Sequence, residues 1–365
     1  MGFKCGIVGL PNVGKSTLFN ALTQTAAAQA ANYPFCTIEP NVGDVAVPDP
    51  RLDTLAKIAG SAEIIPTRIT FVDIAGLVRG ASKGEGLGNQ FLANIREVDA
   101  VAHVLRCFAD DDITHVEGRI DPIGDAETVE TELMLADLDS VEKRLPALEK
   151  KAKGGEKEAK EALALVMKAV TLLRDGKPAR LADLTPEERG PYSQLGLMTS
   201  KPVLYVLNVE EASAAHGNEI SAKAEMMAKK QGAMSVVISA KIEEEIAQMS
   251  PEDRPDFLAS LGLEEPGLNR LIRAGYELLG LLTFFTAGPK EARAWTVTKG
   301  SRAPQAAGAI HTDFEQGFIR AETIAYPDYV ANKGEAGARD AGKFRLEGKD
   351  YVVADGDVMH FRFNN

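Results

Sequence analysis

Short apolar runs alternate with helical patterns in two parts of the chain, residues 1–125 and 200–280. Each run has the length and apolar content of a buried strand, and the residues between runs repeat apolar side chains at helical spacing, as at Leu18 and Leu22. The strand-like runs are residues 6–8, 67–73, 100–106, 202–207 and 235–238. Strands and helices in this order predict an α/β domain with a mostly parallel sheet.

The chain between these two parts has a different pattern. Residues 125–177 are rich in Ala, Leu, Glu and Lys with apolar side chains at helical spacing, and the stretch 151–157, which contains two glycines, interrupts them. We therefore expect an antiparallel, partly coiled helical hairpin inserted into the first domain, and assign residues 126–199 to it. Its mixed charges favour solvated faces, with a partner-binding arm as the alternative.

Strand patterns predominate after a predicted closing helix at residues 267–282. The strand-like runs here are residues 281–286, 292–297, 317–324, 351–353 and 358–363, and residues 306–314 predict one short helix. This order favours a small β-grasp-like module, residues 281–365. The first domain then consists of residues 1–125 and 200–280.

A glycine-rich sequence joins the first strand to the first helix. Gly9, Gly14, Lys15 and Ser16 fit the phosphate-loop spacing G-x-x-x-x-G-K-[ST]. The glycines let successive backbone N–H groups turn toward phosphate oxygens at a helix N-terminus. We expect Lys15 to act on the β- and γ-phosphates and the Ser16 hydroxyl to bind Mg²⁺. The predicted nucleotide-binding residues of this loop are Asn12, Val13, Gly14, Lys15, Ser16 and Thr17.

Two further segments are predicted to complete the phosphate site. Asp73 ends a strand and Gly76 follows, a D-x-x-G spacing in which the carboxylate holds Mg²⁺ through water and the glycine N–H meets the γ-phosphate. Residues 32–41 lose any regular pattern between the phosphate loop and this strand, so they are a candidate switch in which Thr37 contacts Mg²⁺ and the γ-phosphate. An ordinary surface loop is the alternative for residues 32–41.

The base side of the nucleotide is expected where the strand 202–207 ends. Guanine-specific enzymes carry N-K-x-D here, whereas this chain has Asn208, Val209 and Glu211. A carboxylate accepts from N1–H and the amino group of guanine but would face a lone pair on adenine N1, while Asn208 can accept from the adenine N6 amine. The altered pattern favours adenine. The predicted base-side residues are Asn208, Val209, Glu211, Ser239 and Ala240.

The residue that activates water is not the usual one. Leu77 follows Gly76 at the position where Ras-like enzymes carry a water-orienting Gln, so the site either hydrolyses slowly or uses another group. His115, in a polar loop after the strand 100–106, could orient water or stabilise phosphate charge. A solvated loop histidine is the alternative for His115, and we expect His103, within that strand, to be a core residue.

Composition narrows the class of partner and the compartment. The net charge of −12 over 365 residues argues against a generic polyanion binder. Residues 281–365 carry 11 Lys and Arg against 11 Asp and Glu, so this module is the part that nucleic acid would repel least. Three cysteines without C-x-x-C spacing indicate reduced thiols and a cytoplasmic location. No apolar run reaches the roughly 18 residues of a membrane span.

Taken together, the motifs resemble the YchF-type Obg-like ATPases over essentially the full length. The resemblance rests on the phosphate loop at 9–17, the sequence Asn-Tyr-Pro-Phe-Cys-Thr-Ile-Glu-Pro-Asn at 32–41, Asp-Ile-Ala-Gly-Leu at 73–77, and Asn-x-x-Glu at 208–211. The last of these is the most specific. The resemblance implies a C-terminal TGS domain and a preference for ATP within a class descended from GTPases.

The resemblance also implies roles for individual residues and a partner. Similar proteins carry a hydrophobic residue at the position of Leu77 and use a histidine after the following strand, which makes His115 the predicted catalytic partner of Lys15. Asn12 matches a position that helps to hold K⁺ in similar potassium-stimulated enzymes. The family is described as binding ribosomes, and the surface between the helical arm and the TGS-like module is the expected contact with RNA or the ribosome.

We therefore predict a slow, Mg²⁺-dependent P-loop ATPase that is monomeric and cytoplasmic. MgATP would order residues 32–41 and 76–90, and hydrolysis would release them for a partner to read. An Obg-like GTPase is the alternative in the same class. A nucleotide-gated module that binds ribosomes or RNA with little turnover is the alternative from a different class.

Overall fold

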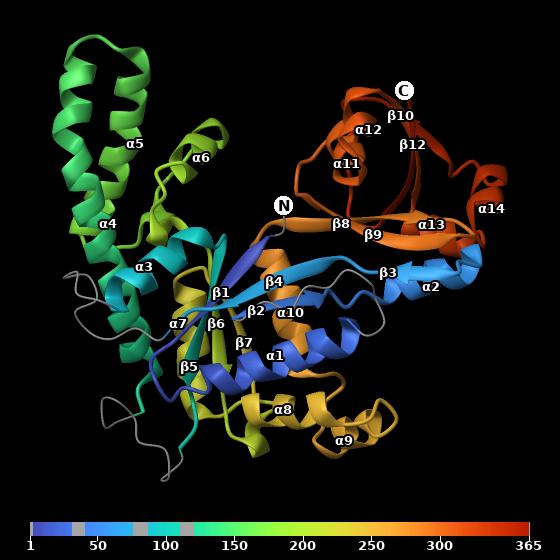
Figure 1. Ribbon diagram of the computed structural model, residues 1–365, viewed down its shortest axis with the longest axis horizontal. Helices are drawn as coiled ribbons and strands as arrows, with labels where there is room; N and C mark the ends of the chain where they lie inside the picture. Colours follow the sequence, from blue (N-terminus) through green and yellow to red (C-terminus); the bar gives the residue numbers. More distant parts are fainter. Residues whose placement is uncertain (1–2, 31–40, 76–86, 110–119, 365) are drawn as a thin grey trace.

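The computed structural model describes residues 3–30, 41–75, 87–109 and 120–364. Two six-stranded sheets organise these residues (Figure 1). The first has the order β2-β4-β1-β5-β6-β7, and its neighbouring strands are parallel except for β2 with β4. Its strands are β1 (Lys4–Val8), β2 (Val42–Ala46), β4 (Arg68–Asp73), β5 (Ala100–Arg106), β6 (Val203–Asn208) and β7 (Met234–Ile238). Because the other five strands are parallel, their carboxyl ends meet at one edge.

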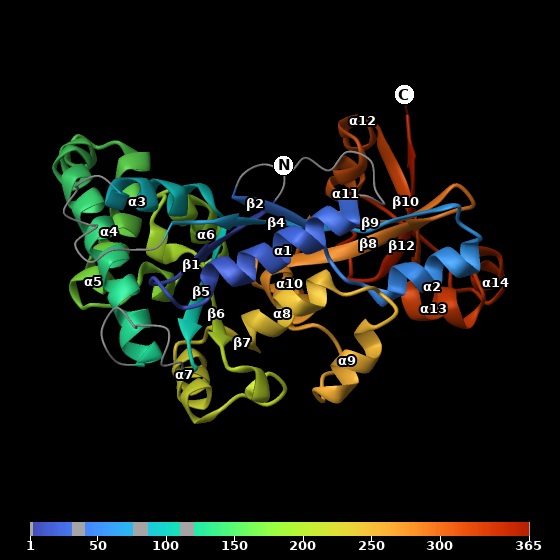
Figure 2. The ribbon, with the colours of Figure 1, turned by 60° about the horizontal axis from the view of Figure 1, so that its bottom comes forward.

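Helices cover both faces of this sheet. The helices α1 (Lys15–Ala30) and α10 (Gly267–Leu278) bury apolar side chains on one face, and α7 (Glu219–Lys230) packs on the other against Tyr205 and Leu207. The helices α1 and α8 lie side by side in both views (Figures 1 and 2). The remaining helices here are α3 (Leu87–Glu97), α8 (Ala240–Gln248), α9 (Arg254–Ser260) and the short η4 (Glu211–Ser213). This doubly wound arrangement confirms the predicted α/β class.

A helical hairpin projects from the first sheet (Figure 1). The helix α4 (Pro122–Lys153) begins at its N-cap Asp121, whose carboxylate accepts from Gly124 N at 3.0 Å. Its first turns lie on the sheet, and its later turns pack along α5 (Lys157–Arg174) through a separate apolar cluster. The turn between the two helices falls at the glycines that interrupt the helical pattern, and Gly155 there has φ +94°.

The root of this arm is fixed by a buried carboxylate. After α5 the chain returns through η2 (Ala179–Leu181), α6 (Pro186–Ser193) and η3 (Met198–Ser200). Asp137 of α4 is 1% exposed and accepts from Met198 N at 2.9 Å and Thr199 N at 2.8 Å. Burial raises the pKa of Asp137, while the hydrogen bonds from Thr199 and Met198 oppose that rise. The arm is therefore held to the sheet by polar contacts as well as by apolar packing.

The second sheet has the order β11-β10-β12-β8-β9-β3. Its strands are β3 (Glu63–Ile65), β8 (Leu281–Ala287), β9 (Glu291–Thr298), β10 (Phe318–Ala325), β11 (Arg345–Glu347) and β12 (Asp357–Phe363). The helix α11 (Ala303–Ile310) packs on the face that carries Phe284, with α12 (Thr312–Gln316) beside it. The helices α13 (Tyr326–Ala331) and α14 (Glu335–Asp340) pack on the face that carries Phe285. Alternation along β8 thus supplies two apolar layers.

Part of the N-terminal half belongs to this second sheet. The strand β3 pairs in parallel with β9, and α2 (Pro50–Ala59) packs on the same face as α13 and α14. The sequence pattern alone assigns residues 1–125 to the first domain, whereas residues 50–65 lie against strands that follow more than 200 residues later. Helical periodicity predicts that α2 has an apolar face, but it does not identify the surface that covers that face.

Three local expectations differ from the structure. The predicted closing helix ends at Leu278 instead of residue 282, because Gly280 at φ +64° turns the chain into β8. Residues 306–314 fall in two helices, since His311 breaks them and its Nδ1 accepts from Asp313 N at 3.2 Å as the N-cap of α12. Residues 351–353 form only an isolated bridge between Val352 and Arg302.

None of the helices in the described ranges is long and apolar enough to cross a membrane.

Candidate nucleotide site

The glycine-rich loop lies between the end of β1 and the first turn of α1, as its spacing predicts. Asn12 at φ +64° and Gly14 at φ +89° have left-handed backbone conformations. A Cβ on Gly14 would overlap with the Nδ2 atom of Asn208, and a Cβ on Gly9 would lie 2.9 Å from Val104 O. Both glycines are therefore required by close approach, and Gly14 also by its backbone angle.

Lys15 and Asp73 come together at the edge where β1 and β4 end. The two strands are neighbours with Ile7 opposite Asp73, and Lys15 begins the helix that follows β1. The Lys15 ammonium forms an ion pair with the Asp73 carboxylate, and these side chains are 11% and 19% exposed. Ser16 is exposed beside them. The described residues thus bring together a cation for phosphate and two oxygen donors of the kind that Mg²⁺ prefers.

Asn208 connects the phosphate loop to the base side. Its side chain is 4% exposed, its Nδ2 donates to Val13 O at 2.9 Å, and its Oδ1 accepts from Ala240 N at 2.9 Å. Ser239, the N-cap of α8, is 2% exposed, and its Oγ has no hydrogen-bond partner within the described part of the chain. The asparagine that the sequence analysis assigns to the base therefore also braces the loop that holds phosphate.

The acidic residue of the predicted base reader is not free. The Glu211 carboxylate forms an ion pair with the Lys241 ammonium, and these side chains are 44% and 69% exposed. The adjacent Glu210 turns toward its own loop and accepts from Asn218 Nδ2 at 2.8 Å. Burial by itself would raise the pKa of Glu210, but hydrogen bonds from Ser213 Oγ, from its own backbone and from Asn218 lower it.

A cleft of about 1070 Å³ joins these groups and is large enough for a nucleotide. The lining includes the predicted residues Asn12, Gly14, Lys15, Ser16, Thr17, Asn208, Val209, Glu211, Ser239 and Ala240. Val13 itself is 1% exposed and takes part through its carbonyl oxygen. The structure thus gathers the predicted phosphate-side and base-side residues into one cleft. Thr37, Gly76, Leu77 and His115 lie outside the described residues, so their predicted roles stay predictions.

The cleft also contains a residue that the sequence analysis missed. Phe108 lines it, together with Lys241, which belongs to the predicted base-side loop Ser239-Ala240-Lys241. Phe108 follows β5, and the Arg106 guanidinium lies 4.7 Å from its ring centroid while Arg106 Nε donates to Phe108 O at 3.2 Å. Arg106 is 1% exposed, which makes it a buried support for the wall of the cleft. The position of Phe108 at the carboxyl end of a buried strand was the signal that could have identified it.

Segments predicted as switches are only partly described. The range 32–41 contributes only Asn41, whose carbonyl oxygen accepts from Asp73 N at 2.9 Å. Residues 87–90 begin the helix α3, although the sequence analysis includes them in a glycine-rich loop that nucleotide orders.

His103 is 4% exposed within β5, as expected of a core residue.

Fold and cleft together define a class of protein. A phosphate loop between a parallel strand and a helix, an acidic residue at the end of the adjacent strand, and an asparagine that braces the loop from the base side are the features of a P-loop nucleotide-binding protein built like a GTPase. The second sheet and the helical arm distinguish this chain within that class.

Comparisons with known proteins identify the family. One family model, described as a 50S ribosome-binding GTPase, matches residues 4–136, and the YchF-GTPase C-terminal model, described as a protein of unknown function, matches residues 281–364. Proteins named ribosome-binding ATPase YchF from Haemophilus influenzae and Bacillus subtilis are 60% and 56% identical to this chain, and each alignment covers 100% of both chains. The chain belongs to the YchF family.

A solved structure agrees with this assignment. The structure of the Schizosaccharomyces pombe YchF GTPase is 39% identical and superimposes with a TM-score of 0.89 over 99% of this chain and 98% of that chain. The family resemblance carried by the motifs and the fold class predicted from the sequence are therefore confirmed.

Proposed function

We propose that this chain is a slow, Mg²⁺-dependent ATPase whose nucleotide state is read by the ribosome. The observation that carries the choice of ATP is the altered base side of the cleft, where Glu211 is paired with Lys241 and Val209 is buried at 2% exposure in place of a lysine. A carboxylate engaged by an ammonium is a weaker acceptor for the N1–H and amino group of guanine. The relatives named ribosome-binding ATPase support the same choice.

Magnesium and potassium belong to the finer part of the proposal. Ser16 and Asp73 would hold Mg²⁺ together with the phosphates, with Thr37 as the third protein ligand, and Gly76 would meet the γ-phosphate. The metal would neutralise charge on the β- and γ-oxygens, while Lys15 binds the same phosphates. Asn12 would help to hold K⁺, and phosphate release compared in KCl and NaCl at equal ionic strength tests this role.

Base choice is tested by competition. A fluorescent ATP analogue is displaced by ATP or GTP from wild-type protein and from Glu211→Ala. We expect wild-type protein to bind ATP more tightly than GTP. Glu211→Ala should change the ratio of the ATP and GTP dissociation constants by less than about threefold, because exposed ion pairs contribute ~0–1 kcal/mol. Tighter binding of GTP in the wild type, lost in Glu211→Ala, would overturn the choice of ATP.

A GTPase is the second candidate, because one matching family model is described as a 50S ribosome-binding GTPase and the solved relative is described as a YchF GTPase. The same competition separates the two candidates.

A nucleotide-gated module without significant turnover is the other alternative, and measuring phosphate release distinguishes it from an ATPase. His115→Ala should slow release ~100-fold or more if His115 positions water or stabilises charge, whereas His216→Ala, an exposed histidine in the loop after β6, should leave it unchanged.

The ribosome would be contacted through the helical arm and the second sheet. Both project from the nucleotide-binding sheet in Figure 1. Co-sedimentation of full-length protein with ribosomes, in ATP and in ADP, tests whether binding follows the nucleotide. Equal recovery in ATP, ADP and no nucleotide would overturn the switch. A ribosomal partner would place the protein in the cytoplasm, and we propose that it acts as a monomer.

A further inference from the structure

The connection between β2 and β4 is far longer than a hairpin requires. These strands are antiparallel neighbours with Ala46 opposite Arg68, and Val47 N donates to Thr67 O at 2.9 Å where they part. Such strands can be joined by a turn of about two residues. Here residues 48–66 leave the first sheet, carry α2 and β3 to the second sheet, and return. We call residues 47–67 the linking segment.

The linking segment is built into the second sheet. The strand β3 extends that sheet beside β9, and Leu55 of α2 is fully buried in the cluster that contains Phe285. Ser61 Oγ donates to Gly288 O at 2.7 Å, which attaches the turn between α2 and β3 to the turn between β8 and β9. Apolar burial and main-chain pairing therefore hold the segment on the second sheet at several points.

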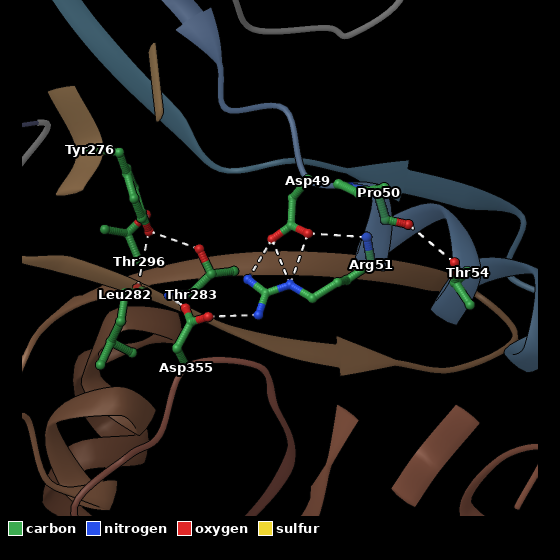
Figure 3. A network of polar contacts seen from close by, with 9 residues as sticks. All are labelled: Asp49, Pro50, Arg51, Thr54, Tyr276, Leu282, Thr283, Thr296 and Asp355. Carbon is green, nitrogen blue, oxygen red and sulfur yellow. Dashed lines mark hydrogen bonds and ion pairs between the residues drawn. The ribbon is translucent and has the colours of Figure 1, made fainter. Parts of the chain in front are cut away.

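Arg51 makes the polar contact at the start of α2 (Figure 3). Asp49 caps the helix by accepting from Arg51 N at 3.0 Å, and it also accepts from Arg51 Nε at 2.9 Å and Nη2 at 2.8 Å. Arg51 Nη1 donates to Asp355 Oδ2 at 2.6 Å. The other oxygen of Asp355 accepts from Thr283 N at 2.9 Å. One guanidinium thus bridges the linking segment to the turn before β12 and, through Asp355, to β8.

A second contact ties the same place to the first domain. The hydroxyl of Tyr276, in the last turns of α10, donates to Leu282 O at 3.0 Å and lies 3.0 Å from both Thr283 Oγ1 and Thr296 Oγ1 (Figure 3). Tyr276 is 8% exposed. The second sheet is therefore attached to the first domain by α10 on one side and by the linking segment on the other.

The carboxyl end of β4 lies at the nucleotide site. This strand begins directly after the linking segment and ends at Asp73, which is paired with Lys15. Strands in a packed sheet transmit small displacements because the core around them resists deformation. A contact that fixes the linking segment on the second sheet therefore also limits the positions available to β4 and to its terminal carboxylate.

We propose that Arg51 is a positioning residue for nucleotide binding, acting through the linking segment and β4 on Asp73. The proposal rests on the proposed nucleotide-binding function of the cleft. Its physical basis is positional: when Arg51 no longer bridges to Asp355, the start of β4 can shift with the linking segment, the Asp73 carboxylate is displaced from its best position, and affinity for nucleotide with Mg²⁺ falls. By reciprocity, a partner whose binding to the second sheet changes nucleotide affinity has its own affinity changed by nucleotide by the same factor.

The test is a double-mutant cycle on nucleotide affinity. The dissociation constant of a fluorescent ATP analogue is measured in the presence of Mg²⁺ for wild type, Arg51→Gln, Asp355→Asn and the double variant, well below the melting temperature of each. We expect each single variant to weaken binding about fivefold, near the lower limit of typical coupling. The double variant should be no weaker than either single one, because both remove the same bridge. Asp355→Asn keeps an oxygen for Thr283 N, so it is selective for the contact to Arg51.

Two controls make the result decisive. Arg302→Gln removes another Arg–Asp ion pair, to Asp350 at 2.7 Å, that lies wholly within the second sheet's own part of the chain, and it should leave nucleotide affinity within twofold. Arg51→Lys should recover only part of the loss, because a single ammonium cannot reproduce the guanidinium contacts to both Asp49 and Asp355. These two variants separate a positional effect from a general loss of stability.

Each outcome has a definite meaning. Arg51→Gln with a lower melting temperature but wild-type nucleotide affinity would overturn the proposal and leave Arg51 a purely structural residue. Equal loss of affinity in Arg302→Gln would overturn it too, since the effect would then not depend on the linking segment. Wild-type protein that binds neither ATP nor GTP would overturn the proposed function itself, and this inference with it.

Discussion

Replacing Asp73 with Asn removes two things at once: the charge that holds Lys15 and the acidic group proposed to bind Mg²⁺. In the structure the Lys15 ammonium is engaged by the Asp73 carboxylate. Incoming phosphates must therefore compete with Asp73 for Lys15. The two effects of Asp73→Asn should have opposite signs, and they can be separated by leaving Mg²⁺ out.

The burial of the pair gives the magnitude. Because the two side chains are only 11% and 19% exposed, the pair is worth more than the ~0–1 kcal/mol of an exposed salt bridge. A charge-assisted hydrogen bond contributes ~1.5–3 kcal/mol. If about half of that opposes phosphate binding, nucleotide without Mg²⁺ should bind Asp73→Asn about three- to tenfold more tightly than wild type. With Mg²⁺ present, the variant should lose the gain in affinity that the metal gives the wild type.

The assay is a titration with a fluorescent ATP analogue, in EDTA and in Mg²⁺, followed by phosphate release. Glu130→Gln is the matched control: Glu130 of α4 forms an ion pair with Arg180 of η2, away from β4 and the cleft, and these side chains are 16% and 13% exposed. It should leave both titrations within twofold. Unchanged or weaker binding of metal-free nucleotide by Asp73→Asn would refute the view that this ion pair competes with phosphate.

Three further predictions concern stability and the phosphate loop. Burial, with a smaller effect of Arg180, lowers the pKa of His103 from 6.5 to about 4; its contribution to stability is then complete above pH 6.5 and is lost as the pH falls toward 4. Urea unfolding should show about 2 kcal/mol less stability at pH 5 than at pH 7 from this group, a loss absent in His103→Leu. Gly14→Ala should weaken nucleotide binding, measured by calorimetry, more than tenfold, because the added Cβ would overlap with Asn208. Gly60→Ala is the control: Gly60 has φ +65° with open space around it, so the variant should only lower stability, by ~1 kcal/mol. Lys201→Met should lower the melting temperature by ~2–4 °C with unchanged nucleotide affinity, because Lys201 Nζ caps the C-terminal end of α3 through bonds of 2.8 and 2.7 Å to its carbonyls.

The phosphate side of the site could be predicted because its determinants are local. The loop, Lys15 and Ser16 lie within one strand–turn–helix unit, and Asp73 ends a strand whose position next to β1 follows from the order of elements. Spacing and hydrophobic pattern carry that information directly. The hydrophobic pattern also predicted the helical arm and the strands of the C-terminal module, although not the residues that attach them.

The linking segment shows what the pattern could not supply. An amphipathic helix at residues 50–59 is compatible with either sheet, and only long-range packing against Phe285 and its neighbours decides between them. The ion pairs of Arg51 with Asp355 and of Glu211 with Lys241 are of the same kind. Each joins side chains whose proximity depends on how separate elements pack, so neither partner predicts the other from sequence.

Asn208 separates two questions that the sequence motif combines. Its amide holds Val13 O and Ala240 N, so it braces the phosphate loop against the base-side loop, a task that any purine nucleotide requires. Its Oδ1 keeps one lone pair for a base donor, which guanine does not offer at its 6-position and adenine does. Discrimination therefore depends on whether the flanking carboxylate is free to hold the other edge of guanine. Because Lys241 engages Glu211, the base side can lose its preference for guanine without any change in Asn208.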